Sequence, residues 1–144
     1  MSYKIRKLNY YYAITQDKPG EVHKILSILA DVGVNQLAFN AMQMGPERSQ
    51  ITLFPEDDSL LLNVAKKAGL DLDGPYQAIL VQGSDELGAL IEVHEKLHSA
   101  NINIASSTAI ADGGGSYGYL IYLRPDDYDK ATDVLSIWRK KYIT

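Results

Sequence analysis

The segment 94–98 (HEKLH) has the residue types and spacing of a catalytic zinc site. It matches His-Glu-x-x-His, in which two histidines one helical turn apart bind zinc and the glutamate acts as a general base. A catalytic zinc also needs a third protein ligand, and no histidine or glutamate follows His98, so Asp112 would have to serve. Because this helix is also expected to lie flat on a sheet, a zinc hydrolase is the remotest of the functions that we consider.

Binding chemistry of another kind is available where two segments, 17–22 (DKPGEV) and 85–90 (DELGAL), open amphipathic patterns. The first turn of a helix has unpaired N–H groups and a partial positive charge, which suit a carboxylate. The aspartate that opens each segment could accept hydrogen bonds from an ammonium group, or could simply cap the helix. Asn35 and Asn103, where the next strands begin, could hold either group or satisfy turn backbone.

The two segments belong to an internal repeat, which determines the architecture. They are 68 residues apart, and so are the two asparagines. Pro55 and Pro125 are 70 residues apart, so the second copy has two extra residues, which we place in the turn 112–115. The repeat predicts two small α/β modules, at residues 1–73 and 74–144.

Hydrophobic periodicity predicts the elements that position these groups, in the order strand, helix, strand, strand, helix within each copy. We expect strands at about 8–15, 34–44, 48–54, 77–82, 102–111 and 117–123, and helices at about 17–33, 57–69, 88–100 and 127–140. Gly33 and Asn101 are expected to end helices in the left-handed conformation. A fourth strand would lie at 71–76, or merge into the next strand, in the first copy, and only at 142–144 in the second.

The first copy resembles the ACT domain, a small regulatory module that binds amino acids in metabolic enzymes and their regulators. It has the polar residue, Pro-Gly and apolar residue of the family motif at 17–22, and Gly-x-Asn at 33–35 after one helix. The second copy has Leu87 in place of the proline and Asn101 in place of the glycine. The resemblance covers essentially the whole chain. It implies an α+β fold of two tandem ferredoxin-like (βαββαβ, ACT-type) modules, with antiparallel sheets and helices on one face of each.

The resemblance also implies a non-enzymatic regulatory or sensing protein that binds an amino acid at an interface between ACT-like modules. In amino-acid-binding ACT domains, polar residues matching Thr15, Asp17 and Asn35 contact the ligand. The alternative is a regulatory subunit that binds a metabolic enzyme without a small ligand. The predicted ligand-binding residues are Thr15, Asp17, Pro19, Gly20, Asn35, Asp85, Gly88 and Asn103, and no catalytic residue, metal or cofactor is predicted.

Composition limits the remaining possibilities. The net charge of −4 and the pI near 5.3 argue against nucleic-acid binding. No apolar run approaches the roughly 18 residues of a membrane span, and the absence of cysteine favours a cytoplasmic protein. Each half of roughly 70 residues is small for independent stability, so we expect the halves to pack on each other or in a homodimer.

Tyrosines are concentrated on the predicted strands. Strand alternation should send about half of them to the face opposite the helices. There they could line a ligand pocket or simply cover the sheet, and we expect them to line a subunit interface. The residues concerned are Tyr10, Tyr11, Tyr12, Tyr117, Tyr119 and Tyr122. The glycine run 113–115 lacks the Lys-Ser/Thr of a phosphate-binding loop, and we interpret it as a hairpin tip.

Overall fold

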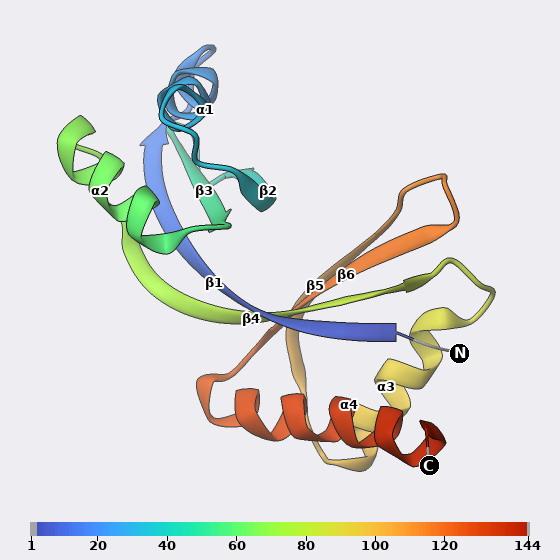
Figure 1. The fold of residues 1–144 in the computed structure, drawn as a ribbon. Helices are drawn as coiled ribbons and strands as arrows, with labels where there is room; N and C mark the ends of the chain where they lie inside the picture. Colours follow the sequence, from blue (N-terminus) through green and yellow to red (C-terminus); the bar gives the residue numbers. More distant parts are fainter. Residues whose placement is uncertain (1–2, 144) are drawn as a thin grey trace. The chain divides into compact units, whose positions relative to one another are not determined.

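The computed structural model describes the backbone of residues 3–143 and the side chains of residues 3–136. Figure 1 shows its elements along the chain. They are β1 (Tyr3–Gln16), α1 (Glu21–Asp31), β2 (Gln36–Gln43), β3 (Arg48–Pro55), α2 (Asp58–Ala68), β4 (Asp73–Ser84), α3 (Ala89–Ser99), β5 (Ile104–Ala111), β6 (Ser116–Leu123), the 3₁₀ turn η1 (Pro125–Asp127) and α4 (Tyr128–Ile143). The element order predicted for each copy is confirmed. Within the described residues, no helix is both long and apolar enough to cross a membrane.

The chain divides into two compact units, residues 9–76 and residues 1–8 together with 77–144. The division falls inside β1 and inside β4, so each of these strands contributes to both units. The hydrogen-bonded strand order is β2-β3-β1-β4-β6-β5. The strand pairs β1·β3, β2·β3, β4·β6 and β5·β6 are antiparallel.

This strand order shows where the fourth strand of each copy lies. In the first copy the prediction is confirmed, because β4 begins at Asp73 and continues as the first strand of the second copy. In the second copy the prediction was wrong. Tyr142 and Ile143 belong to α4, which contains no glycine or proline to stop it, and Thr144 lies outside the described residues. The position beside β4 is taken by β1 instead.

The repeat is more regular than the sequence spacing indicated. The backbone N–H of Asp17 donates to the carbonyl of Glu47, and that of Asp85 donates to Gly115, both at 2.9 Å. The 68-residue offset therefore persists through the hairpin, and placing the two extra residues at 112–115 was wrong. They enter after β6, where η1 precedes α4.

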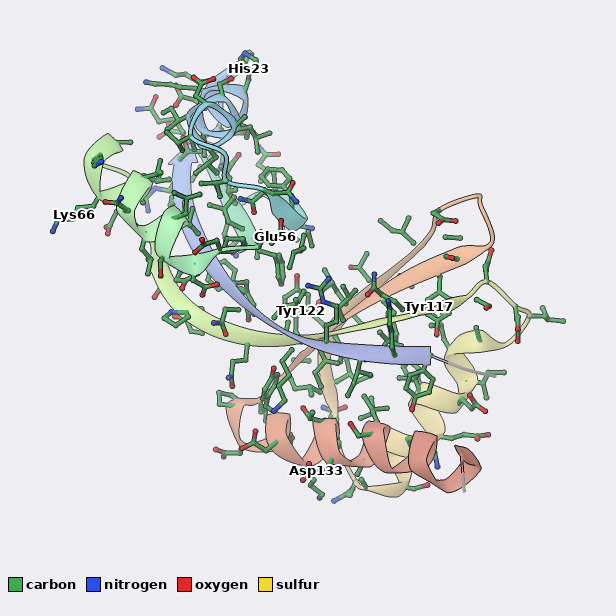
Figure 2. All side chains as sticks on the ribbon, in the orientation of Figure 1. His23, Glu56, Lys66, Tyr117, Tyr122 and Asp133 are labelled. Atoms are coloured by element: carbon green, nitrogen blue, oxygen red, sulfur yellow. The ribbon has the colours of Figure 1, made fainter. Side chains whose placement is uncertain are left out.

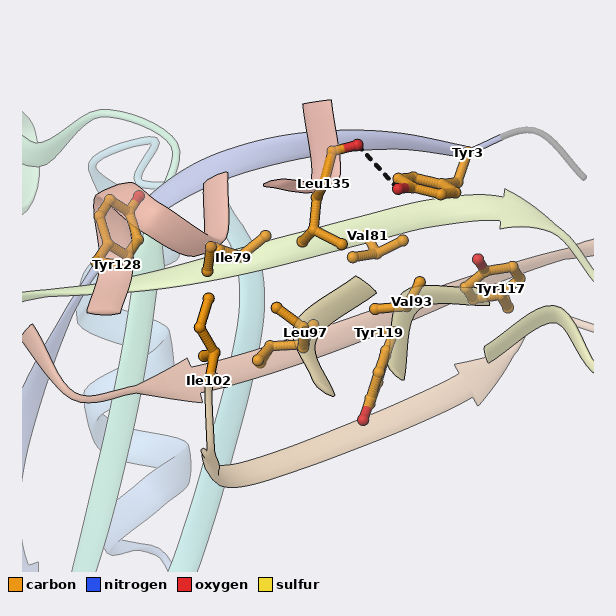
Figure 3. Packing of buried hydrophobic residues seen from close by; sticks show 12 residues of the cluster. Tyr3, Ile79, Val81, Val93, Leu97, Ile102, Tyr117, Tyr119, Tyr128 and Leu135 are labelled. Carbon is orange, nitrogen blue, oxygen red and sulfur yellow. Dashed lines mark hydrogen bonds between the residues drawn. The ribbon is translucent and has the colours of Figure 1, made fainter. Parts of the chain in front are cut away.

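Each unit has its own core. In the unit 9–76, β1 and β3 pack against α1 and α2, with Tyr11, Ile51, Leu53, Leu29 and Leu61 fully buried. In the other unit, β4 and β6 pack against α3 and α4 (Figure 3). Tyr3 joins this second core from β1, and its hydroxyl donates to the carbonyl of Leu135 at 2.9 Å.

The predicted alternation of the tyrosines is confirmed. Tyr11, Tyr117 and Tyr119 belong to the helix-side cores. Tyr10 and Tyr12 alternate with Tyr11 and gather on the other face of β1, where Tyr76 lies 5.6 Å from Tyr10 and 5.4 Å from Tyr12 between ring centroids. Their expected role in an interface stays a prediction.

The left-handed residues after two helices were also predicted correctly. Gly33 has φ 80° and Asn101 has φ 57°. Asn is among the few residues with a side chain that adopts this conformation readily, which explains how it replaces glycine in the second copy.

Candidate functional site

In the unit 9–76, one open cleft of about 940 Å³ contains the start of the ACT-like motif. The end of β1, the loop before α1 and the hairpin between β2 and β3 form its walls. The lining residues are Ile14, Thr15, Gln16, Asp17, Lys18, Glu21, Pro46, Glu47 and Arg48. Carboxylates and cations line it together, so the cleft can offer partners to both a negative and a positive group of one ligand.

Several of these side chains already contact one another. Thr15 Oγ1 donates to Glu21 Oε2 at 3.4 Å, and Lys18 Nζ lies 3.5 Å from Glu21 Oε1. Asp17 Oδ1 accepts a hydrogen bond from Ser49 Oγ on β3 at 3.1 Å. The motif aspartate is thus held against the sheet, with its carboxylate at the cleft.

The alternative that the motif aspartates simply cap the helices was wrong. α1 begins after Gly20 (φ 92°) and α3 after Gly88 (φ 77°), and neither helix has a side-chain cap. The residues between Asp17 and α1 form a turn, in which the N–H of Lys18 donates to Gln16 at 3.1 Å. This turn separates Asp17 from the first helical N–H groups. Pro19 lies in the same turn, before the helix rather than in its first turn.

Not all predicted residues reach the cleft. Pro19 and Gly20 do not line it, although the side of Gly20 where a Cβ would stand is open, with nothing within 4 Å. Asn35 also lies outside its lining. Its Nδ2 donates to Glu56 Oε2 at 3.0 Å, while the N–H of Glu56 donates to the Asn35 carbonyl at 2.9 Å. Glu56 is labelled in Figure 2. The structure therefore brings Thr15 and Asp17 together and gives Asn35 a different neighbour.

The corresponding region of the second unit is organised differently. Asp85 and Gly88 line a mostly apolar pocket of about 380 Å³ beside Ile91 and Ile110. A Cβ on Gly88 would lie 3.2 Å from Ile91 Cδ1, so this glycine faces a side chain rather than open space. Asn103 is exposed and outside the pocket lining.

A separate cavity of about 580 Å³ lies at the end of the β4–β6 pair and includes Tyr3, Lys4 and Asp112. Tyr117 lines both this cavity and the apolar pocket. Burial first, and then the charges of Glu92 and Glu86, raise the pKa of Tyr117. Its hydroxyl is therefore neutral at physiological pH, and no charged partner for a ligand comes from it.

Two charged residues of the first cleft, Glu47 and Arg48, were missed from the sequence. They follow the Gly45-Pro46 turn, and the register that pairs Gln16 with Arg48 brings them beside the motif loop. Among the described residues, neither side chain has an ion pair or hydrogen bond. The pairing of the predicted strands could have identified Glu47 and Arg48, because this pairing places the start of β3 beside the end of β1.

In the His-Glu-x-x-His segment, His94 contacts a tyrosine side chain. Figure 3 includes Tyr119, whose Oη lies 2.7 Å from His94 Nε2 and donates to Ser107 Oγ at 2.9 Å. The His94 ring also stacks on Tyr119, with 5.8 Å between centroids. His94 thus links α3 to β6 and β5. Among the side chains of residues 3–136, no three His, Asp or Glu groups gather as a metal site.

No protein-family model and no curated protein matches this sequence. Solved structures match it over nearly its full length. A protein from Bacteroides thetaiotaomicron superposes with a TM-score of 0.78 at 17% identity, covering 95% of this chain and 90% of that one. The ligand-free regulatory subunit of aspartate kinase from Thermus thermophilus gives 0.66 at 15% identity, covering 93% and 94%. A C-terminal regulatory domain of aspartate kinase from Porphyromonas gingivalis gives 0.58 at 10% identity, covering 94% and 95%.

The chain has the fold of ACT-domain regulatory proteins. The resemblance drawn from the motif at 17–22 is therefore confirmed at the level of the fold. Both aspartate kinase structures named above are regulatory parts of that enzyme, and the match covers almost their whole length. At these sequence identities, the structural match shows the fold alone. The ligand and the partner have to be inferred from the chemistry of the residues.

Proposed function

We propose that this chain is a non-enzymatic regulatory protein of two tandem ACT-type modules, 1–73 and 74–144, that binds a free amino acid. One observation carries the proposal: the cleft at the ACT-like motif is lined by side chains of both charge signs. A free amino acid has a carboxylate and an ammonium group close together, and needs both an acceptor and a cationic or N–H donor. Thr15 and Asp17, the motif residues in this cleft, are the first contacts that we assign.

The proposed ligand contacts follow the repeat. The motif adds Pro19, Gly20 and Asn35 to the proposed ligand contacts, from outside the lining of the cleft. In the second copy, Asp85, Gly88 and Asn103 are the counterparts of Asp17, Gly20 and Asn35. We place the ligand at an interface between ACT-type modules. Binding would then act by linkage, because a ligand favours whichever arrangement of modules binds it better, and a partner protein responds to that arrangement. A metabolic enzyme is the partner that we propose.

A thermal-shift screen with each of the twenty standard L-amino acids tests this function. Ligand at about one hundred times its Kd should stabilise the protein by roughly 2.7 kcal/mol, which raises the melting temperature by several degrees. We expect a selective response that Asp17→Ala weakens about tenfold in Kd, since a charged hydrogen-bond acceptor is lost. Asp17→Ala should otherwise fold, because Asp17 is exposed. No response to any amino acid would refute the proposal.

A second candidate, a subunit that binds an enzyme without a small ligand, is favoured by the apolar surface of the second unit. Leu87 is fully exposed, and Ile91 and Ile110 are 61% and 70% exposed. All three lie at or beside the pocket that replaces the charged cleft. A flat amino-acid screen, with a partner enzyme released by Leu87→Asp, would support this candidate over the first.

A further inference from the structure

The two copies can be compared residue by residue, because the 68-residue offset holds from the first strand through the hairpin. Asp17 has its counterpart in Asp85, but the other charged groups of the first cleft change. Lys18 and Glu21 correspond to Glu86 and Ala89, and Glu47 and Arg48 correspond to Gly115 and Ser116. The second copy therefore has no charged residue at the positions of Glu47 and Arg48.

The two units also differ in how the motif loop and the hairpin are arranged around the cavities. In the first unit, the motif loop and the hairpin line a single cleft. In the second, the loop residues Asp85 and Gly88 line the apolar pocket, whereas Gly83 and Ser116 line the separate cavity near Lys4. A ligand in the second unit could contact the loop or the hairpin strand ends, but these belong to different cavities.

Within the first cleft, two charged side chains are free to receive a ligand. Glu21 is engaged by Lys18 and Thr15, and Asp17 by Ser49. In the part of the chain whose side chains are described, Glu47 and Arg48 have no such partner. They carry opposite charges, are adjacent in sequence and are both exposed at the cleft.

We propose that Arg48 and Glu47 hold the two charged ends of the amino acid, so that the chain binds one ligand, in the first cleft only. The inference rests on the proposed function. The planar Arg48 guanidinium can donate two parallel hydrogen bonds to a carboxylate, and Glu47 can accept from the ammonium group beside Asp17. Both residues act as specificity determinants that select a free zwitterion over a ligand with either end blocked.

The cavity of the second unit does not offer the same pair. Its charged lining residues are Lys4 and Asp112. Asp112 Oδ1 already accepts from the N–H groups of Gly114 at 2.6 Å and Ser116 at 3.1 Å, which closes the hairpin turn. These bonds lower the pKa of Asp112 and keep it ionised, but they direct the carboxylate into its own turn.

The test begins with the twenty standard L-amino acids, each added singly to the wild-type chain in a thermal-shift assay, followed by titration calorimetry of the strongest responder. We expect one ligand per chain. Arg48→Ser, which copies the second unit, should weaken binding about ten- to a hundredfold, as expected for loss of charged hydrogen bonds. Glu47→Gln should weaken it less, and Arg48→Lys should retain part of the affinity. Lys4→Ser, the matched control in the other cavity, should leave it unchanged.

The same titration uses the methyl ester and the N-acetyl derivative of the responding amino acid on the wild-type chain, so the result does not depend on any variant folding. Both should bind at least tenfold more weakly. Two ligands per chain, unchanged binding by Arg48→Ser, or loss of binding by Lys4→Ser would each overturn the inference while amino-acid binding stands. Absence of any response in the wild type would overturn the proposed function, and the inference with it.

Discussion

Tyr11 joins β1 to the beginning of α2 through a charged hydrogen bond. Its ring is 2% exposed, and its hydroxyl donates to Asp58 Oδ2 at 2.7 Å, an oxygen that also accepts from Asn9 Nδ2 at 3.0 Å. Burial, the hydrogen bond and the charge of Asp58 raise the pKa of Tyr11 to about 12. The protonated hydroxyl is therefore part of the folded state.

We predict that Tyr11→Phe lowers the free energy of unfolding at pH 7 by about 1–2 kcal/mol, because the Asp58 carboxylate loses a donor. The pKa is higher in the folded state, so this stabilisation is complete below pH 10 and is lost as the pH rises towards 12. Urea unfolding of both proteins across this range measures the difference. Tyr12→Phe is the control, since the Tyr12 hydroxyl has no hydrogen bond among the described residues. Equal losses in the two variants would contradict the prediction.

At the residue scale, features that depend on the local backbone, such as a helix cap, could be predicted from the sequence. Contacts that depend on strand pairing were missed. Asp57 stands at the start of the helix predicted at 57–69 and caps α2, with Oδ1 accepting from the N–H of Leu60 at 3.2 Å. Asp17 has the same residue type but a turn follows it, so its carboxylate bonds to Ser49 instead. Arg48 is brought to the cleft by its pairing with Gln16, 32 residues away, and no local pattern reports that contact.

At the element scale, β1 is the strand whose role the sequence left unrecognised. Its first residues join the sheet of a unit whose other residues begin at position 77. Hydrophobic periodicity predicts that a segment is a strand, but it does not predict which strand it pairs with. Pairing between strands that are far apart in the sequence leaves no periodic pattern. The helices and the remaining strands, whose buried faces repeat locally, were predicted within a few residues.

The anchoring of β1 by Tyr3 leads to a prediction about this element. Tyr3 is 4% exposed, packs in the core with Val81 and donates to the carbonyl of Leu135. Tyr3→Ala should lower the free energy of unfolding by about 3–5 kcal/mol through the cavity that it leaves. Tyr3→Phe should lower it by about 1 kcal/mol, because only the hydrogen bond is lost. Urea unfolding gives both values, and exposed Lys4 supplies the control Lys4→Ala. A Tyr3→Ala variant as stable as this control would show that β1 is not anchored there.

At the scale of the whole molecule, the two shared strands predict how the chain unfolds. β1 and β4 each run without a break from one compact unit into the other. Unfolding the unit 9–76 would therefore release the strand segments that continue into the second unit, and the second core would lose the support of Tyr3 from β1 and of Ile79 and Val81 from β4. Two units connected by a flexible linker would instead unfold independently.

We expect a single cooperative transition in urea, with the same midpoint by far-UV circular dichroism and by near-UV circular dichroism of the tyrosines buried in both cores.

A sharper form of the test removes a side chain from one core alone. Leu53→Ala, in the fully buried core of the unit 9–76, should also lower the protection of β6 amides in native-state hydrogen exchange, although β6 belongs to the other unit. Protection of the β6 amides that Leu53→Ala leaves unchanged would mean that each unit holds its part of β1 and β4 without the other. Ligand binding in the first cleft could then stabilise the second unit only through contacts other than these strands.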